Sequence, residues 1–478
     1  MVSVFHAIAQ EPPNPRRTRP FSARGIDVNS ASTDRFISKS NRELATLQAR
    51  ERDGRPIRVG IVGAGAYGRT LVSQLVPTPG LRAAVICDTD IDAARNALID
   101  SCGNGVDVRV VESGSTLRDA VSADVPAIVT ELELLGDAGL DVLVDCTGRP
   151  EVGVRTARCA AAGGSDLVMV NVEADAVAGS EMAALVESAG GVYTLADGDQ
   201  PSLIVGLADW AAGIGFEVVA AGKWTDAFSE EDAEGILAER RSNGEAVRES
   251  DITHFDGTKT QLELASAANC LRFRCDTDGM HGASIGLGEL ADRFRSRTRR
   301  ALFSREHVVD YINCVGLASG ESHPGGVFVV VRSDNRLGLE AMARKQCEVS
   351  EDRTHAAFYR PYHLIGVETV RSVVRAAVDR LPTAAPASER SVEVIAVAKR
   401  DMDAGTTLAG IGHDVRGVMV SAEDARSASL LPVGLAERCR LRRAVRKGDR
   451  IGVAEIDRPP DSHGFGLRAD VTSAWNHE

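Results

Sequence analysis

The fold of this chain is decided by the stretch Arg58-Val-Gly-Ile-Val-Gly63-Ala-Gly65-Ala-Tyr-Gly68-Arg-Thr-Leu-Val. Its first half is a short apolar run typical of a buried strand, and its second half carries apolar residues at helical spacing. The pattern Gly-x-Gly-x-x-Gly between a strand and a helix indicates a dinucleotide-binding turn rather than an ordinary tight turn. Gly63 permits the turn, Gly65 lets the backbone approach a pyrophosphate, and Gly68 allows close helix–strand packing. We expect the cofactor to be contacted by Gly63, Ala64, Gly65, Ala66, Tyr67 and Gly68.

A carboxylate ends the second predicted strand, Ala83 to Asp88, about twenty residues after the glycine turn. An acid at this place usually accepts hydrogen bonds from the adenosine ribose hydroxyls. Asp88 would repel a 2′-phosphate and therefore favours NAD, whereas Arg82 and Arg95 nearby keep NADP open. The predicted cofactor is NAD or NADP.

Strands and helices alternate over the residues that follow, which favours a doubly wound parallel sheet. The further strands are predicted at 127–130, 140–146 and 166–171, with a helix at 152–162. Ligands of open α/β folds bind at the carboxyl ends of such strands. Thr147 and Gly148, which follow one of these ends, are therefore predicted to contact the cofactor.

The next strand end is followed by Asn171, Glu173 and Asp175, in a loop expected to face the nicotinamide. Carboxylates there are suited to bind substrate hydroxyls or a divalent metal. Capping of the following helix is an equally good explanation of the same residues. Asn171 and Glu173 are predicted substrate-binding residues, and the metal requirement stays open.

Composition narrows the class of protein. The 478 residues carry a net charge of −13, which argues against a broad basic surface for nucleic acid. No apolar run approaches the length that spans a bilayer. The nine cysteines are scattered singly, without zinc-site spacing, and favour a reducing cytoplasm. The expected partner is a small-molecule substrate, with no nucleic acid and no membrane.

The chain is predicted to have several parts. We expect a disordered leader at 1–32, an N-terminal helix at 33–56, a Rossmann domain at 57–190, and a catalytic domain at 191–380 whose last helix returns to the first domain. A linker at 381–390, a small β-rich domain at 391–457 and a mobile tail at 458–478 complete the organisation.

Two lysines are the predicted catalytic residues. Lys223 is expected at a strand end and Lys259 at a helix start, where a side chain can project into a cleft. A lysine that is partly desolvated or close to another cation has a lowered pKa and can act as acid or base. The alternative for each is a solvated surface charge. Asp256, also predicted catalytic, and Glu263, a predicted substrate ligand, share a helix face with Lys259; an ordinary Glu263–Lys259 ion pair explains this spacing equally well.

Two further residues are predicted to bind substrate. His281 has glycines on both sides, which favours a loop near a ligand, although a lone histidine is more often structural. Arg360 between Tyr359 and Pro361 is suited to hold a phosphate or carboxylate in bidentate fashion.

These motifs together resemble the deoxyxylulose phosphate reductoisomerase-like (DRL) family of homoserine-dehydrogenase-like oxidoreductases. The resemblance rests on the glycine turn and on Val170-Asn-Val-Glu-Ala-Asp175, Asp197-Gly-Asp-Gln-Pro201, Asp256-Gly-Thr-Lys259, Gly279-Met-His-Gly282 and Tyr359-Arg-Pro-Tyr-His-Leu364. The segment 392–456, with Ala398-Lys-Arg-Asp-x-x-Ala-Gly405-Thr-Thr-Leu, resembles a SAF domain. The resemblance covers about residues 35 to 457.

The resemblance implies a Rossmann domain, an α+β catalytic and oligomerisation domain, and a β-clip-like SAF domain in a homo-oligomer, either a dimer or a tetramer. It also implies an NAD(P)-dependent oxidoreductase that transfers hydride to or from a small polyhydroxy or oxo substrate. The specific form is a reductoisomerase acting on deoxyxylulose phosphate, and a plain alcohol or aldehyde oxidoreduction is its nearest rival. The competing hypothesis is a non-catalytic nucleotide sensor or scaffold with a ligand-binding SAF domain.

Two departures from the family pattern bear on the substrate. Homoserine dehydrogenases carry a lysine just after the asparagine that matches Asn171, and here Val172 and Glu173 follow it. This difference argues against homoserine. The stretch Trp224-Thr-Asp-Ala-Phe228 is bulky and acidic where the family pattern leads us to expect a glycine and a basic residue, which speaks against a phosphorylated substrate.

Overall fold

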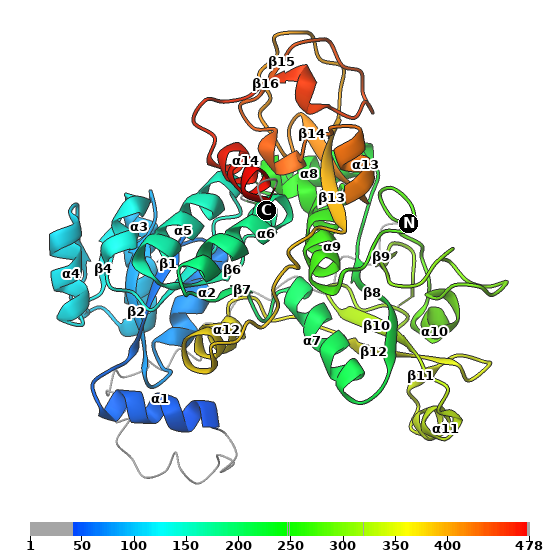
Figure 1. The fold of residues 1–478 in the computed structure, drawn as a ribbon, viewed down its shortest axis with the longest axis horizontal. Helices are drawn as coiled ribbons and strands as arrows, with labels where there is room; N and C mark the ends of the chain where they lie inside the picture. Colours follow the sequence, from blue (N-terminus) through cyan, green and yellow to red (C-terminus); the bar gives the residue numbers. More distant parts are fainter. Residues whose placement is uncertain (1–41, 246, 248, 319, 476–478) are drawn as a thin grey trace. The chain divides into compact units, whose positions relative to one another are not determined.

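The computed structural model describes residues 42–245, 247, 249–318 and 320–475 (Figure 1). The predicted leader and the first part of the predicted N-terminal helix lie outside these residues. The rest of that helix is α1 (Arg42–Arg52), whose Glu51 Oε2 accepts a hydrogen bond from the Gly80 backbone N–H at 2.7 Å.

The first sheet has seven parallel strands in the order β3-β4-β2-β1-β5-β6-β7. These strands are β1 (Ile57–Val62), β2 (Leu81–Cys87), β3 (Arg109–Val110), β4 (Ala127–Val129), β5 (Val142–Asp145), β6 (Asp166–Met169) and β7 (Tyr193–Leu195). The chain runs outward from β1 on one side and returns to begin again at β5, so the topological switch point lies between β1 and β5. Ligands of doubly wound folds bind at this place.

Helices cover both faces of this sheet, and the strands are buried on both sides as parallel strands require. The helical elements are α2 (Ala66–Leu75), α3 (Ile91–Cys102), α4 (Gly114–Ser122), η3 (Leu132–Asp137), α5 (Pro150–Gly163) and α6 (Val172–Ser188). Ile57, Val59 and Ile61 are fully buried in one core with Leu71 and Leu75 of α2. The predicted Rossmann sheet is confirmed.

Two expectations about this region need correction. Residues 172–175 are not a loop, because α6 begins at Val172 and Asn171 is its N-cap. The capping explanation of Asn171 therefore holds. The sheet also continues past the expected domain boundary at 190, because β7 pairs in parallel with β6.

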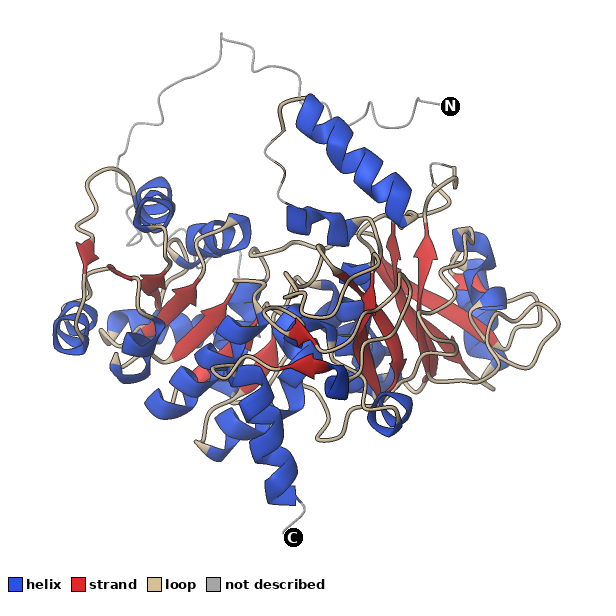
Figure 2. Cartoon of the chain, turned by 90° about the horizontal axis from the view of Figure 1, so that it is seen from above, coloured by secondary structure: helices blue, strands red, loops and turns tan. Residues whose placement is uncertain are grey.

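The second domain is built on a five-stranded mixed sheet in the order β11-β12-β10-β8-β9. Its strands are β8 (Glu217–Thr225), β9 (Val308–Asn313), β10 (Val327–Arg332), β11 (Glu348–Val349) and β12 (His355–Arg360). Its helical elements are α7 (Gln200–Gly213), α8 (Glu230–Ser242), η4 (Glu249–His254), α9 (Thr258–Leu271), η5 (Leu287–Glu289), α10 (Leu290–Arg293) and α11 (Arg336–Arg344). Figure 2 shows the strands of the two large sheets as separate groups with helices between them. Lys223 lies inside β8 rather than after its end.

A helix then returns to the first domain. α12 (Thr369–Val374) continues into η6 (Arg375–Asp379) and packs on α2. The Tyr67 and Thr369 hydroxyls are 2.6 Å apart. The predicted linker follows as an extended segment beside the first sheet, where the Ala384 carbonyl accepts the Leu195 N–H at 2.8 Å.

The C-terminal part contains an antiparallel pair, β13 (Val392–Ala398) and β14 (Val415–Ser421). The remaining elements are α13 (Ala422–Ser427), η7 (Val433–Leu435), β15 (Arg440–Leu441), η8 (Val453–Glu455), β16 (Ile456–Asp457) and α14 (His463–Trp475). The expected mobile tail instead contains α14, which packs on α5 and α6. The Glu151 carboxylate accepts the His463 backbone N–H at 2.7 Å and so fixes the start of this helix.

Candidate active site

A cleft of about 910 Å³ opens at the carboxyl ends of β1, β2 and β5 and extends to β8 and α9 of the second domain. It joins the glycine turn at one end to the predicted lysines at the other. The predicted site residues that line it are Gly63, Gly65, Ala66, Tyr67, Asp88, Thr147, Gly148, Glu173, Lys223, Lys259 and Glu263. Residues that sequence reasoning missed, Asp199, Asp226, Asp251, His254 and His363 among them, also line it.

The glycine turn has the space and the donors that a pyrophosphate needs. Gly63 has φ +98°, and a Cβ on Gly68 would lie 2.0 Å from the Gly63 carbonyl oxygen, so helix and strand are in contact there. A Cβ on Gly65 would meet nothing within 4 Å, which leaves room above the turn. Gly65 is the N-cap of α2 and no side chain caps this helix start. Its first N–H groups can therefore face an anion, and the turn fits a dinucleotide.

The Asp88 carboxylate is tied to the glycine turn. Its Oδ2 accepts the Ala64 backbone N–H at 2.6 Å, and its Oδ1 accepts the Asp90 N–H at 2.8 Å. Asp90 in turn caps α3 by accepting the Ala93 N–H at 2.9 Å. Asp88 therefore shapes the turn in addition to lining the cleft.

Asn171 supports the neighbouring loop from beneath. Its side chain is buried, accepts the Ala174 N–H at 3.0 Å, and donates to the Thr147 hydroxyl at 3.1 Å and to the Arg149 carbonyl at 2.9 Å. The buried Asp145 carboxylate accepts hydrogen bonds from the Thr147 N–H and hydroxyl. Asn171 is thus outside the cleft lining and holds the loop that contributes Thr147 and Gly148.

Two lysine–glutamate pairs lie where the two domains meet. Lys259 Nζ of α9 is 2.6 Å from Glu173 Oε1 of α6, and Lys223 of β8 pairs with Glu263 of α9. Lys259 and Glu263 thus each pair with a residue of another element, and the expected Glu263–Lys259 ion pair within α9 does not form. All four side chains are at least three-quarters buried, with exposures of 22%, 15%, 6% and 8% in the order named.

The protonation of Lys259 differs from the expectation. Burial alone would lower the pKa of Lys259, but the carboxylates of Glu173, Glu263 and Asp199 raise it above its ordinary value. The ammonium is therefore stabilised as a cation. A cationic lysine can donate hydrogen bonds and stabilise developing negative charge, and it is a poor general base near neutral pH.

Asp199 is a titratable cleft residue that was not among the predicted site residues. It is the N-cap of α7, where its Oδ1 accepts the Gln200 N–H at 2.9 Å. Burial, with a smaller effect from the Glu263 carboxylate, raises the pKa of Asp199 to about 7, and the nearby lysines act in the opposite direction. A carboxyl group that titrates near neutral pH is suited to proton transfer. The signal available in the sequence was its place after β7, at the carboxyl edge of the sheet.

One oxygen of Glu173 has no partner among the described residues. Its Oε1 pairs with Lys259, whereas Oε2 is buried and accepts no hydrogen bond in this part of the chain. A Cβ on Gly148 would lie 3.7 Å from this oxygen. Glu173 Oε2 is therefore an acceptor for a ligand hydroxyl or amide group that enters between α6 and the Gly148 loop.

Besides Asn171 and the turn residues Ala64 and Gly68, three predicted site residues do not line the cleft. Asp256 accepts the Thr258 N–H at 2.9 Å and lies 3.4 Å from Lys399 Nζ, so it supports the start of α9. His281 Nε2 lies 3.0 Å from Asp276 Oδ2, as in a structural histidine. Arg360 pairs with Glu368 at 2.5 Å, and its guanidinium lies 4.6 Å from the centre of the Tyr362 ring. Each of these side chains is thus held by the protein itself.

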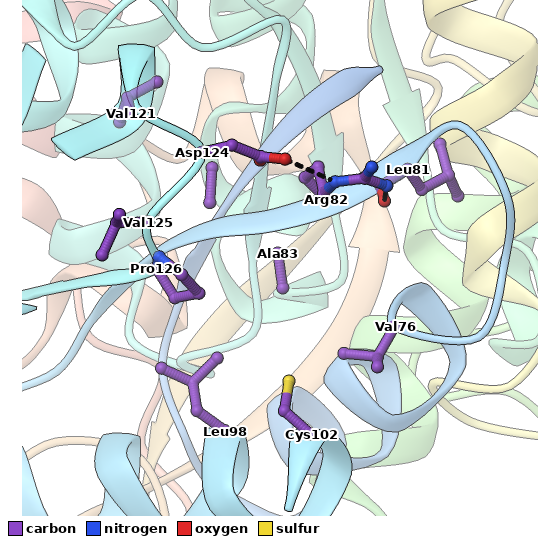
Figure 3. Close-up of a pocket in the computed structure, with 11 residues that line it drawn as sticks. Val76, Leu81, Arg82, Ala83, Leu98, Cys102, Val121, Asp124, Val125 and Pro126 are labelled. Carbon is purple, nitrogen blue, oxygen red and sulfur yellow. Dashed lines mark hydrogen bonds and ion pairs between the residues drawn. The ribbon is translucent and has the colours of Figure 1, made fainter. Parts of the chain in front are cut away.

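A second, smaller cavity of about 200 Å³ lies at the opposite, amino-terminal edge of the first sheet (Figure 3). Its walls are mostly apolar, and the charged residues that line it, Arg82 and Asp124, bond each other at 3.0 Å. Arg82 is also held by Glu51 at 2.8 Å. This cavity is remote from the glycine turn and presents no group suited to catalysis.

The described residues offer no cluster of three or more His, Cys, Asp or Glu side chains that could hold a metal ion. The predicted carboxylate site for a divalent metal therefore gains no support. In the same part of the chain, no helix combines the length and the apolar character needed to cross a membrane.

Comparison with known families identifies the second domain. Residues 198–369 match the family model described as "Oxidoreductase DRL, catalytic domain". This match bears out the resemblance to the DRL family over these residues. The chain therefore combines a Rossmann-like parallel sheet with a segment that matches the model of a DRL oxidoreductase catalytic domain.

Similarity to solved structures is distant. One of them is the 1-deoxy-D-xylulose 5-phosphate reductoisomerase from Zymomonas mobilis in complex with NADPH, with 16% identity over 45% of this chain and 57% of that chain and a TM-score of 0.33. The chain thus spans little more than half of that reductoisomerase. Another is a myo-inositol dehydrogenase from Corynebacterium glutamicum, with 13% identity over 63% of this chain and 75% of that chain and a TM-score of 0.33. No protein of curated function matches the chain.

Proposed function

We propose that the protein is an NAD(P)-dependent oxidoreductase that transfers hydride to or from a small, uncharged polyhydroxy or oxo compound. The observation that carries this proposal is the single cleft that joins the glycine turn to Lys223, Lys259 and Asp199. The nicotinamide, when bound, accepts or supplies the hydride. The residues of the second domain must then bind the substrate oxygen and move its proton.

The buried charges assign complementary roles to two residues. The Lys259 ammonium, held cationic by its carboxylate neighbours, donates a hydrogen bond to the reacting oxygen and stabilises the negative charge that develops there. Asp199, whose pKa is raised to about 7, takes the hydroxyl proton from an alcohol substrate, or in the reverse direction donates a proton to the oxygen of a carbonyl substrate as the hydride adds to its carbon. Glu263 fixes the Lys223 ammonium beside them.

The unpaired Glu173 oxygen supports a hydroxylated ligand. Glu173 Oε2 is a buried acceptor without a partner in the described chain. A hydroxyl or carboxamide N–H of a bound ligand would satisfy it, whereas a carboxylate or phosphate oxygen would be repelled.

Charge balance in the cleft supports an uncharged substrate. Each lysine or arginine among the lining residues has a carboxylate partner: Lys223 with Glu263, Lys259 with Glu173, Arg149 with Glu437 at 3.7 Å, and Arg155 with Glu133 at 2.6 Å. The acidic lining residues are Asp88, Glu173, Asp199, Asp226, Asp251 and Glu263. A phosphate site needs cations that are not already neutralised. The charges thus favour oxidoreduction of a neutral alcohol or carbonyl compound over the isomerisation of deoxyxylulose phosphate.

The test is an absorbance screen of the full chain with NAD, NADP and their reduced forms against polyols, sugars, hydroxy ketones and the matching phosphate esters. We expect turnover with neutral compounds and little with their esters. Cofactor binding without turnover of any compound would instead support a sensor or scaffold. Faster turnover of the phosphate esters would contradict the proposed substrate class.

A further inference from the structure

The C-terminal module, defined as residues 391–457, packs on both helices that carry the Lys259–Glu173 pair. β13 and β14 lie against α9 (Figure 1). η7 lies against α6. The module is far from the glycine turn in sequence and contributes no residue to the cleft lining. Its contacts with α9 run from Asn269 near the end of the helix, which bonds Val392, to the first turn, where Lys259 lies. Its contacts with α6 include Val177, one turn after Glu173.

The start of α9 is fixed by the module through a buried ion pair. Lys399 Nζ lies 3.4 Å from Asp256 Oδ2, and the two side chains are 6% and 0% exposed. The other Asp256 oxygen accepts the Thr258 N–H at 2.9 Å, one residue before Lys259. The N-cap of α9 is Gly257, at φ +82°, which has no side chain to hold the first turn. The module therefore reinforces the support that Asp256 gives in place of an ordinary cap.

Strand β14 adds two direct contacts to the same turn. The Gly417 backbone N–H donates to the Thr258 hydroxyl at 3.1 Å, and the Met419 N–H donates to Gln261 Oε1 at 2.9 Å. A Cβ on Gly417 would lie only 3.2 Å from Thr258 Cγ2. The edge of the strand is thus in van der Waals contact with the helix start.

The module also packs closely against α6. A Cβ on Gly434 of η7 would lie 2.4 Å from Val177 Cγ2 and 3.0 Å from Pro150 Cγ, so no larger residue fits without a shift. Val177 lies one turn after Glu173 on α6. The module thereby contacts α9 at its first turn and α6 one turn after Glu173.

We propose that the C-terminal module sets the relative position of α9 and α6, with Lys399 as a positioning residue that acts through Asp256 on the first turn of α9. Loss of the Lys399 charge leaves the buried Asp256 carboxylate without its cation, and the first turn of α9 loosens. The effect on turnover rests on the proposed function of Lys259, whereas the effect on α9 does not.

The experiment measures amide hydrogen exchange at residues 257–262 in the full chain, without and with NADPH. The variants are Lys399→Met, Lys399→Arg and the control Arg450→Met. Arg450 also joins the module to the second domain, through Asp278 at 2.6 Å, but this pair is exposed and does not touch α9. We expect Lys399→Met to speed exchange there about tenfold or more, with Lys399→Arg and Arg450→Met within about twofold of wild type.

Turnover is the second readout, with any compound that the screen identifies. Lys399→Met should lower kcat about tenfold with KM within about twofold, because the cleft is intact and the ammonium is misplaced. Unchanged exchange in Lys399→Met, or an equal change in Arg450→Met, would overturn the positioning role. If Lys399→Met does not fold, Asp256→Asn removes the same charge pair while keeping the acceptor for the Thr258 N–H. The same exchange and turnover results in this variant then support or overturn the positioning role. Full activity of Lys259→Met would overturn the proposed function and leave the exchange result standing.

Discussion

Lys259 Nζ lies 2.6 Å from Glu173 Oε1 and joins the first turn of α9 in the catalytic domain to the first turn of α6 in the Rossmann domain. Both side chains line the cleft that also contains the glycine turn. Val172 and Glu173 follow Asn171, and the ammonium that pairs with Glu173 comes from α9 of the second domain. The pair therefore joins the domain that carries the glycine turn to the helix that carries the proposed hydrogen-bond donor.

Substitution of Lys259 tests its role as the donor to the reacting oxygen. Lys259→Met should lower turnover about 100-fold or more, since loss of a preorganised donor costs this much in comparable sites. Binding of NADH or NADPH, measured by fluorescence, should persist because the glycine turn is unaffected. Lys345→Met, on an exposed residue after α11, is the matched control and should leave turnover unchanged. Turnover near wild type in Lys259→Met would remove the assignment.

Asp199 predicts the pH dependence of the reaction. Because burial raises its pKa to about 7, alcohol oxidation should accelerate as pH rises through 7, and carbonyl reduction should slow over the same range. Asp199→Asn should abolish this titration and lower the rate in both directions. The measurement compares rate profiles from pH 5 to 9 for the wild type and the variant. If the change in rate near pH 7 persists in Asp199→Asn, another group is responsible for it.

The same shift predicts an effect on stability. The folded protein holds a proton on Asp199 between its ordinary pKa and about 7, and the unfolded chain does not. The unfolding free energy contributed by this group therefore falls as pH rises through that range. Asp199→Asn should gain stability relative to wild type between pH 4 and 7, by urea unfolding. A difference that is constant with pH would show that the carboxyl group does not titrate as inferred.

Asp88 is expected to select the cofactor. Asp88→Ser removes the charge that opposes a 2′-phosphate and should raise the ratio of NADP to NAD affinity about tenfold. The variant should also weaken binding of both cofactors, because Asp88 holds the Ala64 N–H of the turn. Asp92→Ser, in the exposed first turn of α3, serves as control. An unchanged ratio in titrations with both cofactors would limit Asp88 to its structural role.

Substitutions of Gly65 and Gly68, two of the three glycines of the turn, should have different effects. Gly65→Ala places a methyl group where nothing lies within 4 Å, at an ordinary φ of −66°, so stability should hold while dinucleotide binding is lost. Gly68→Ala forces a Cβ toward the Gly63 carbonyl and should cost about 1–3 kcal/mol of unfolding free energy. Thermal unfolding and cofactor titration of both variants separate the effects; equal loss of binding and stability in the two would argue against a phosphate above Gly65.

Much of the architecture could be predicted because its signals are local. The strand–glycine–helix pattern at Ile57–Leu75 carries its own periodicity, and Lys259 lies at the helix start that the sequence indicates, although Lys223 lies inside its strand. The pairings were not predictable, because they depend on tertiary distance. Lys259 had Glu263 four residues away as a partner, yet it bonds Glu173 of another domain.

Residues whose roles were predicted wrongly also depend on partners that the sequence pattern did not reveal. Asp256 was expected in the cleft, and its partner Lys399 comes from the C-terminal module. Arg360 had the pattern of an anion ligand, but Glu368 neutralises it. α14 is anchored by Glu151, a residue distant in sequence, so no local signal distinguished it from a tail.

The most direct test of hydride transfer at this cleft follows an isotope from the cofactor to the substrate. The full chain is mixed with a reduced nicotinamide deuterated at C4 on the transferred face and with the neutral carbonyl compounds of the screen, and the products are analysed by mass spectrometry. The account predicts deuterium on the carbinol carbon of a neutral product with wild type and its loss with Lys259→Met. Cofactor binding without deuterium in any product, or transfer only to phosphate esters, would contradict it.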